Sequence, residues 1–70
     1  MIRQPVRSSD LKSVGFDAST RTLEIEFQDG SIYQYDGVPP AIHAALMQAS
    51  SHGSYFHRSI KERYRYRRVR

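Results

Sequence analysis

"TLEIEFQDGSIYQY", residues 22–35, contains two strand-like segments joined by a tight turn. Leu23, Ile25 and Phe27 alternate with polar residues, which is the period of a strand with one buried face. The Asp-Gly pair that follows is a hairpin signal, and the IYQY segment returns as the next strand. Residues 11–17, LKSVGFD, add a strand with β-branched and aromatic residues before this hairpin. We therefore expect a three-stranded antiparallel meander.

The register of the hairpin decides where Tyr33 and Tyr35 point. A two-residue turn at Asp29 and Gly30 would place both tyrosines with the two glutamates of the first strand, away from its apolar face. A type I turn with Gly30 as a G1 bulge would instead set Ile25 opposite Tyr33 and bring both tyrosines into the core. Glycine suits either turn because both need a positive φ at that position. We favour the bulge, since it gives a small domain a more continuous apolar face and leaves the tyrosine hydroxyls at the edge of the sheet.

Two helical segments follow the meander. Pro39 and Pro40 end the last strand, and a proline fits the first turn of a helix. The segment after them carries one apolar stripe at helical spacing, formed by Ile42, Ala45, Leu46 and Ala49. In the segment SSHGS, Gly53 is the expected stop of this helix and Ser51 or Ser54 the cap of the next. Phe56 and Ile60, four residues apart, mark the apolar side of the second helix.

These elements predict an α+β fold in which two helices pack on one face of a three-stranded antiparallel meander. The basic C-terminal tail is a candidate for a short extra strand. Residues 1–10 are polar, contain a proline and show no periodicity, so we expect a flexible N-terminal lead-in. Residues 11–70 then form a single domain, because a chain of 70 residues is too short for two cores.

Composition limits the cellular setting and the chemistry. The chain has no cysteine, which excludes disulfides, thiolate metal sites and a cysteine nucleophile, and which suits a reducing compartment. No apolar run is long enough for a signal peptide or a membrane span. We expect a cytoplasmic protein without membrane contact.

Positive charge is concentrated in the second half of the chain. Residues 1–35 contain four Lys or Arg and five Asp or Glu, whereas residues 36–70 contain seven and two. A one-sided basic surface attracts polyanions such as nucleic acids. The alternative is a solvated tail that only keeps the protein soluble.

The tail KERYRYRRVR, residues 61–70, combines two kinds of contact that suit RNA. Arginine binds phosphate through paired hydrogen bonds, and tyrosine stacks on an exposed base. Tyr33 and Tyr35 offer a further polar handle through their hydroxyls. In the alternative, the tyrosines of the tail pack on the sheet and its arginines are merely solvated. The predicted nucleic-acid-binding residues are Arg58, Lys61, Arg63, Tyr64, Arg65, Tyr66, Arg67 and Arg68.

The ordered set of motifs resembles the KTSC domain family, which is named after C-terminal regions of lysyl-tRNA synthetases and also occurs as short stand-alone bacterial proteins. The resemblance runs from about Ser9 to Val69. It rests on Tyr33-Gln34-Tyr35, on Phe27, Asp29 and Gly30 in the hairpin, on Val38 and Pro39, and on Ser51, Gly53, Tyr55, Phe56 and Ile60. Arg65 departs from the family pattern, in which a proline is expected between the last two tyrosines. Through the association with synthetases, the resemblance implies RNA binding without a settled enzymatic activity.

Metal and catalytic sites are not expected. His43, His52 and His57 have no carboxylate at a supporting spacing, so we predict no metal and no cofactor. The serines near His52 are sufficiently explained as helix caps and turn residues. A nucleophile also needs an oriented base and a pocket that excludes water, for which so small a domain has little room. The sequence therefore predicts a protein that is not an enzyme.

The leading hypothesis is a small non-catalytic RNA-binding module whose partner is RNA, either tRNA or a single strand. The alternative is a protein–protein interaction module with no nucleic-acid role. In that case the tail docks on an acidic protein partner, or the sheet edge pairs with another chain. Glu24 and Glu26 count against an RNA site on their own face of the sheet, because carboxylates repel phosphates. The identity of the RNA and the oligomeric state stay open.

Overall fold

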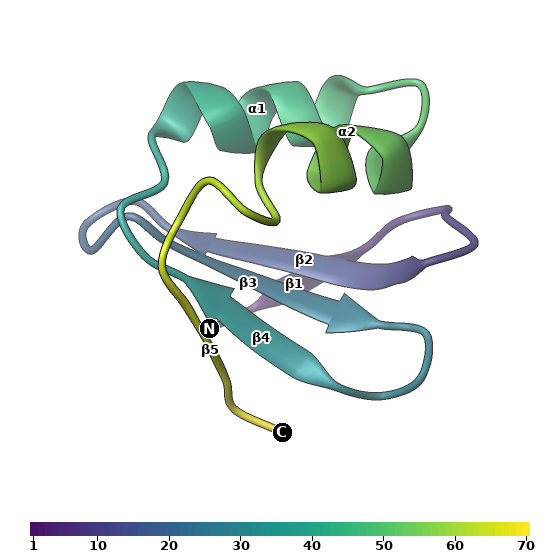
Figure 1. Ribbon diagram of the computed structural model, residues 1–70, viewed down its shortest axis with the longest axis horizontal. Coiled ribbons are helices and arrows are strands. Elements are labelled where there is room, and N and C mark those ends of the chain that lie inside the picture. Colours follow the sequence, from purple (N-terminus) through teal and green to yellow (C-terminus); the bar gives the residue numbers. More distant parts are fainter.

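Five antiparallel strands form one sheet in chain order, and two helices lie on one of its faces (Figure 1). The computed structural model describes all residues from 1 to 70. The α+β fold with both helices on one face is confirmed, and the sheet has two outer strands beyond the expected three-stranded meander. The elements are β1 Arg3–Pro5, β2 Leu11–Asp17, β3 Thr22–Phe27, β4 Ile32–Tyr35, α1 Pro40–Gln48, α2 His52–Ser59 and β5 Tyr66–Arg68.

Strand β1 lies within the segment for which the sequence predicted a flexible lead-in. It pairs antiparallel with β2, and Arg3 stands opposite Gly15. A side chain at Gly15 would crowd this strand, because a Cβ there would lie 3.0 Å from the carbonyl oxygen of Ile2 and 3.0 Å from Cγ of Arg3. Pro5 is tolerated because β1 is an edge strand. Residues 3–5 show no alternation of apolar and polar side chains, so the sequence does not indicate a strand there. The strand becomes evident only from its pairing with β2 at Gly15.

Strand β5 is the short extra strand for which the tail was a candidate. It pairs antiparallel with β4, with Tyr66 opposite Tyr35 and Arg68 opposite Tyr33. The chain reaches this edge by running down from α2 past the side of the sheet (Figure 1). Because Tyr66 stands opposite Tyr35, its side chain lies on the same helix-covered face of the sheet as Tyr33 and Tyr35.

The β3–β4 hairpin has the predicted bulge. Ile25 pairs with Tyr33 and Leu23 with Tyr35, which places both tyrosines on the apolar face. The amide of Gly30 donates to the carbonyl of Phe27 at 2.9 Å, and Gly30 has a φ of 91°. A left-handed residue after a type I turn is the geometry of the G1 bulge.

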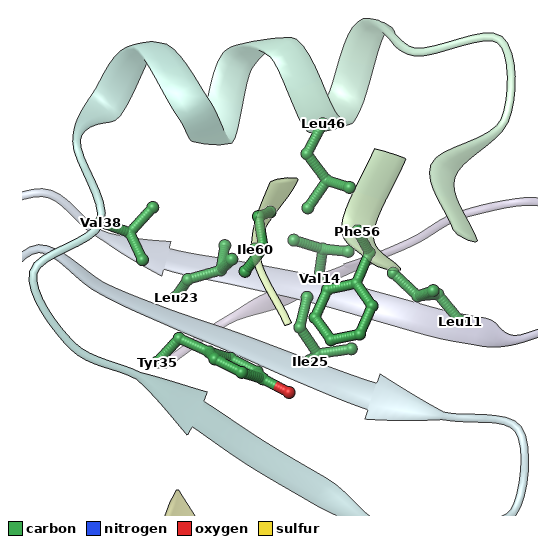
Figure 2. Close-up of a cluster of buried hydrophobic side chains, with 9 residues drawn as sticks. All are labelled: Leu11, Val14, Leu23, Ile25, Tyr35, Val38, Leu46, Phe56 and Ile60. Carbon is green, nitrogen blue, oxygen red and sulfur yellow. The ribbon is translucent and has the colours of Figure 1, made fainter. Parts of the chain in front are cut away.

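A core of nine buried residues fills the space between the sheet and the helices (Figure 2). Tyr35 is 3% exposed and contributes its ring to this core together with Phe56, which is 1% exposed. Several larger side chains, including Tyr33 and Tyr64, are only partly buried and pack against the cluster. The core members are Leu11, Val14, Leu23, Ile25, Tyr35, Val38, Leu46, Phe56 and Ile60.

The two helices begin as their sequences predict, but the break between them differs. Pro40 opens α1 without a side-chain cap, and Ser51 caps α2 by accepting from the amide of Ser54 at 3.2 Å. Gly53 was predicted to stop the first helix; instead it lies in the first turn of α2, packed against the β1–β2 connection. His52 links the helices, because its Nδ1 donates to the carbonyl of Leu46 at 2.8 Å.

Neither helix is long and apolar enough to cross a membrane.

Candidate nucleic-acid interface

An aromatic cleft opens where α2, the connection to β5 and strands β3 and β4 meet. Its volume is about 600 Å³. We call it the aromatic cleft and define it by its ten lining residues. Its aromatic residues are Phe27, Tyr33, Tyr35, Phe56, Tyr64 and Tyr66, and its polar rim consists of Asp10, His57, Lys61 and Glu62.

Five of the six aromatic rings of the cleft, all except that of Tyr64, form one continuous cluster. The Tyr66 ring lies 5.9 Å from that of Tyr33 and 5.7 Å from that of Tyr35, measured between centroids. Phe56 makes edge-on contacts with Tyr35 and with Phe27, each at 5.4 Å. Edge-on and tilted rings are the arrangements that aromatic quadrupoles favour. Tyr66 is nevertheless 57% exposed, so it forms the open wall of the cleft.

Tyr35 lines the cleft although almost all of its surface is buried. It is 3% exposed, yet its hydroxyl has no hydrogen-bond partner within the chain and is not fully enclosed. Burial raises the pKa of Tyr35 to about 12, with further contributions from the neighbouring Tyr33 and Tyr66. The phenol therefore stays protonated near neutral pH and keeps its capacity to donate.

The rim of the cleft carries both signs of charge. His57 Nε2 lies 2.5 Å from a carboxylate oxygen of Asp10, which joins α2 to the β1–β2 connection. Lys61 and Glu62 follow α2 and are exposed. Because the Asp10 carboxylate is engaged by His57, Lys61 is the rim group best placed to meet an anion.

A second, polar cleft lies at the N-terminal end of α2, on the other side of the Asp10–His57 pair. Its volume is about 770 Å³, and no hydrophobic residue lines it. Arg58 lies here and not with Lys61, and its guanidinium carbon sits 5.8 Å from the centroid of the Tyr55 ring. The lining residues are Arg7, Ser8, Ser9, Asp10, Ser50, Ser51, His52, Gly53, Ser54, His57 and Arg58.

Arg67, one of the predicted phosphate contacts, is engaged by groups of its own chain. Its Nη1 is 3.1 Å from both carboxylate oxygens of Asp36, and its Nη2 donates to Oε1 of Gln34 at 2.7 Å. It pairs with Gln34 across β4 and β5, on the face of the sheet opposite Tyr66. By contrast, Arg63 and Arg65 are exposed in the connection that leads to the cleft.

The sheet face without helices is organised around Glu24. Its carboxylate accepts from Arg3 at 2.5 Å and from Nε2 of Gln34 at 2.8 Å. Burial alone would raise the pKa of Glu24, but the hydrogen bonds from Gln34 and Arg3 outweigh it and hold the pKa below its ordinary value. Glu26 lies on the same face and accepts from the Ser13 hydroxyl at 2.8 Å. Both glutamates therefore stand on the opposite face of the sheet from the tyrosines.

Seven of the ten predicted site residues fall into three places, while Arg63, Arg65 and Arg68 are exposed along the connection after α2 and on β5. Tyr33, Tyr35, Tyr64, Tyr66 and Lys61 meet at the aromatic cleft, Arg58 lies in the polar cleft, and Arg67 lies across the sheet. Sequence reasoning did not include Phe27 and Phe56 in the site, although their spacing placed them on the apolar faces that meet there. Arg7 gave no signal, because it belongs to the segment predicted as a lead-in.

The protein is a small α+β domain. It has a five-stranded antiparallel sheet, two helices on one face of that sheet and an aromatic cleft beside the second helix. The family model of the KTSC domain matches residues 7–64. The chain therefore belongs to the KTSC domain family.

Known proteins similar to this chain include stand-alone domains and parts of larger enzymes. The crystal structure of a KTSC domain protein from Yersinia pestis superposes with a TM-score of 0.96 at 42% identity, covering 99% of this chain and 97% of that one. An uncharacterized protein from Stutzerimonas stutzeri is 41% identical over 99% of both chains. A lysine–tRNA ligase from Trichormus variabilis is 38% identical over 87% of this chain. The matching segment covers only 11% of the length of the ligase.

Proposed function

We propose that this protein is a small, non-catalytic RNA-binding module of the cytoplasm. Lys61, Arg63, Arg65 and Arg68 contact phosphates, while Tyr66 and Tyr64 stack on unpaired bases. The observation that carries the proposal is the half-exposed ring of Tyr66, which forms the open wall of the aromatic cleft beside these exposed cations. An accessible ring among exposed positive charges is the combination that single-strand binders use.

RNA is the class of partner that the relatives favour. The lysine–tRNA ligases that contain a related segment are named for a tRNA substrate. Single-stranded parts of an RNA also present the unstacked bases that an aromatic cleft can hold. Glu24 and Glu26 occupy the other face of the sheet, so the carboxylates near the cleft are Asp10, which is paired with His57, and the exposed Glu62.

Structural roles of the serines and histidines support a function without catalysis. Ser51 caps α2, and the Ser8 hydroxyl accepts from the amides of Asp10 and Leu11 at 3.1 Å each. His52 is bound to the carbonyl of Leu46 and His57 to Asp10. No serine hydroxyl is hydrogen-bonded to either histidine, which is the contact that an activated serine nucleophile would make.

The test is a titration with a short single-stranded RNA at several salt concentrations. If about four cations neutralise phosphates, the logarithm of the affinity should fall with the logarithm of salt with a slope near −3. Replacing Arg63 and Arg65 together by glutamine should make this slope less steep by about 1.4. The matched control is Arg21→Gln, which removes an exposed arginine at the far hairpin. No detectable binding at low salt would refute the proposal.

A protein-interaction module is the second candidate, because β5 is the last strand of the sheet and its outer side has no partner. Such an edge can accept a strand from another chain. The variant Arg68→Pro removes one backbone N–H donor from this edge. The second candidate is favoured if the parent protein captures a protein partner but binds no RNA, and if Arg68→Pro loses that capture.

A further inference from the structure

We propose that the aromatic cleft takes up one unstacked nucleobase, whose edge is read by the hydroxyl of Tyr35. This inference rests on the proposed RNA-binding function and names the part of the RNA that the cleft holds. Tyr66 supplies the accessible ring on which the base stacks. Lys61 on the rim meets the phosphate next to that base.

The size and lining of the cleft suit a flat heteroaromatic ring. Its volume of about 600 Å³ falls within the range of small-molecule sites, which runs from roughly 300 to 1,000 Å³. Six of its ten lining residues are aromatic. Stacking of bases on aromatic side chains is a main source of affinity in proteins that bind single strands.

The Tyr35 hydroxyl is the feature that points to a ligand. Tyr35 is 3% exposed, and its ring packs against Phe56 in the core (Figure 2). Its hydroxyl nevertheless lacks a partner within the chain and borders the cleft. Because this hydroxyl is not fully enclosed, it is open to water in the free protein and stays available to a ligand. A base edge that pairs with it takes the place of that water at a fixed position and orientation, which favours bases with a matching edge.

Charge favours a nucleotide over an apolar protein side chain as the occupant. Lys61 lies on the rim, and Arg63, Arg65 and Arg68 follow it in exposed positions. Of the two rim carboxylates, Asp10 is engaged by His57, and Glu62 is exposed next to Lys61. An aliphatic side chain would leave the Tyr35 hydroxyl unpaired, whereas every nucleobase carries both a π face and polar edge atoms.

The direct experiment uses the four ribonucleosides. Because they carry no phosphate, their binding to the cleft does not depend on the arginines. Each is titrated into the protein while the ring protons of Tyr35 and Tyr66 are followed by NMR. We expect at least one nucleoside to shift these resonances saturably in the millimolar range and to bind better than the others. In Tyr35→Phe the preference should shrink at least threefold, while the shift at Tyr66 persists.

Tyr55→Phe is the matched control, because Tyr55 lies on α2 beside Arg58 and does not line the aromatic cleft. It removes the same hydroxyl and should leave the preference unchanged. Tyr66→Ala, at an exposed position, should weaken every nucleoside about tenfold. Tyr35→Phe removes no internal hydrogen bond, and an unchanged circular dichroism spectrum would establish that it folds.

The outcomes separate this inference from the function on which it rests. If RNA binds with the expected salt slope but no nucleoside moves the Tyr35 and Tyr66 resonances, the cleft proposal is wrong and the phosphate surface stands. If nucleosides bind but RNA does not, the cleft proposal stands and the RNA-binding function is wrong. A shift caused by N-acetyl-leucinamide and by no nucleoside would overturn the cleft proposal in favour of a protein side chain.

Discussion

Arg3 on β1 donates to the carboxylate of Glu24 on β3 at 2.5 Å, although strand β2 runs between them. The long arginine side chain can cross β2 because the residue opposite Arg3 is Gly15. Gln34 approaches the same carboxylate from β4, and Arg67 on β5 donates to Gln34. One polar chain therefore connects the strands of the sheet on the face that has no helices.

Replacing Arg3 by alanine should destabilise the fold by about 2 kcal/mol, because it removes a charged partner from a nearly buried carboxylate. The Glu24 side chain is only 9% exposed and that of Arg3 27%. The measurement is urea unfolding at neutral pH. Arg63→Ala, at an exposed position, is the control and should change the free energy of unfolding by less than about 0.5 kcal/mol. A loss as small as the control's would show that β1 is not anchored by this pair.

The pH dependence of stability should also change in Arg3→Ala. The pKa of Glu24 is below its ordinary value of 4.5 in the folded protein, so its stabilising contribution is present above about pH 4.5 and is lost as the pH falls through the folded pKa. Without Arg3, the pKa of Glu24 moves upward and the folded and unfolded values come closer together. The variant should therefore lose less stability than the parent between about pH 5 and pH 3. An equal loss in the two proteins would contradict the role assigned to Arg3.

The sequence predicted those parts of the fold in which the signal is local. Alternation in residues 22–27 defined β3, and the apolar face of a small domain favoured the bulge at Gly30 that the structure confirms. Strand β1 depends on a contact with Gly15 across the sheet, and no property of residues 3–5 alone indicates it. The extra strand β5 was expected only as an option, because a tail of alternating tyrosine and arginine is equally consistent with solvation.

The candidate site was predicted in pieces that only the tertiary structure joins. Tyr33 and Tyr66 are far apart in sequence, yet their ring centroids lie 5.9 Å apart. Charge density in the tail could not separate Arg67 from its neighbours, because the partners of Arg67 are on β4 and just after it. Pairing across the sheet, and not the local composition, determines which arginines stay available.

Gly30→Ala should destabilise the protein by about 1–2 kcal/mol. Gly30 has a φ of 91°, a conformation that is unfavourable for a residue with a Cβ, although the space around it is open. Gly53→Ala is the matched control, since Gly53 is helical and a Cβ there would come no closer than 3.4 Å to its neighbours. It should leave the free energy of unfolding unchanged or raise it by up to about 1 kcal/mol, because alanine is the better helix former. Equal effects of the two substitutions in thermal or urea unfolding would argue against the bulge.

Alkaline pH should destabilise the fold through Tyr35. Its pKa is raised to about 12 in the folded protein from the ordinary value of 10.0. The unfolded chain therefore releases this proton first, so the contribution is fully present below about pH 10 and is lost as the pH rises toward 12. Urea unfolding at pH 9 and pH 11 should show a smaller loss of stability in Tyr35→Phe than in the parent. The control Tyr55→Phe should retain the parent's loss, and a Tyr35→Phe variant that also retained it would contradict the raised pKa of Tyr35.

Replacing Arg67 should affect the stability of the fold, whereas replacing Arg65, two residues away, should affect the salt dependence of RNA binding. Arg67 is 56% exposed in its pair with Asp36, so Arg67→Gln should cost stability of only about 0.5–1 kcal/mol. It should leave the salt dependence of RNA binding unchanged, because its guanidinium is bound to Asp36 and Gln34 on the face opposite the tyrosines. Arg65→Gln should instead leave stability unchanged and make the salt slope less steep by about 0.7, the value for one phosphate contact on a single strand. The measurements are urea unfolding and RNA titrations at four salt concentrations. If Arg67→Gln changed the slope as much as Arg65→Gln, the RNA would have to reach both faces of the sheet or displace Asp36, and the surface proposed here would be wrong.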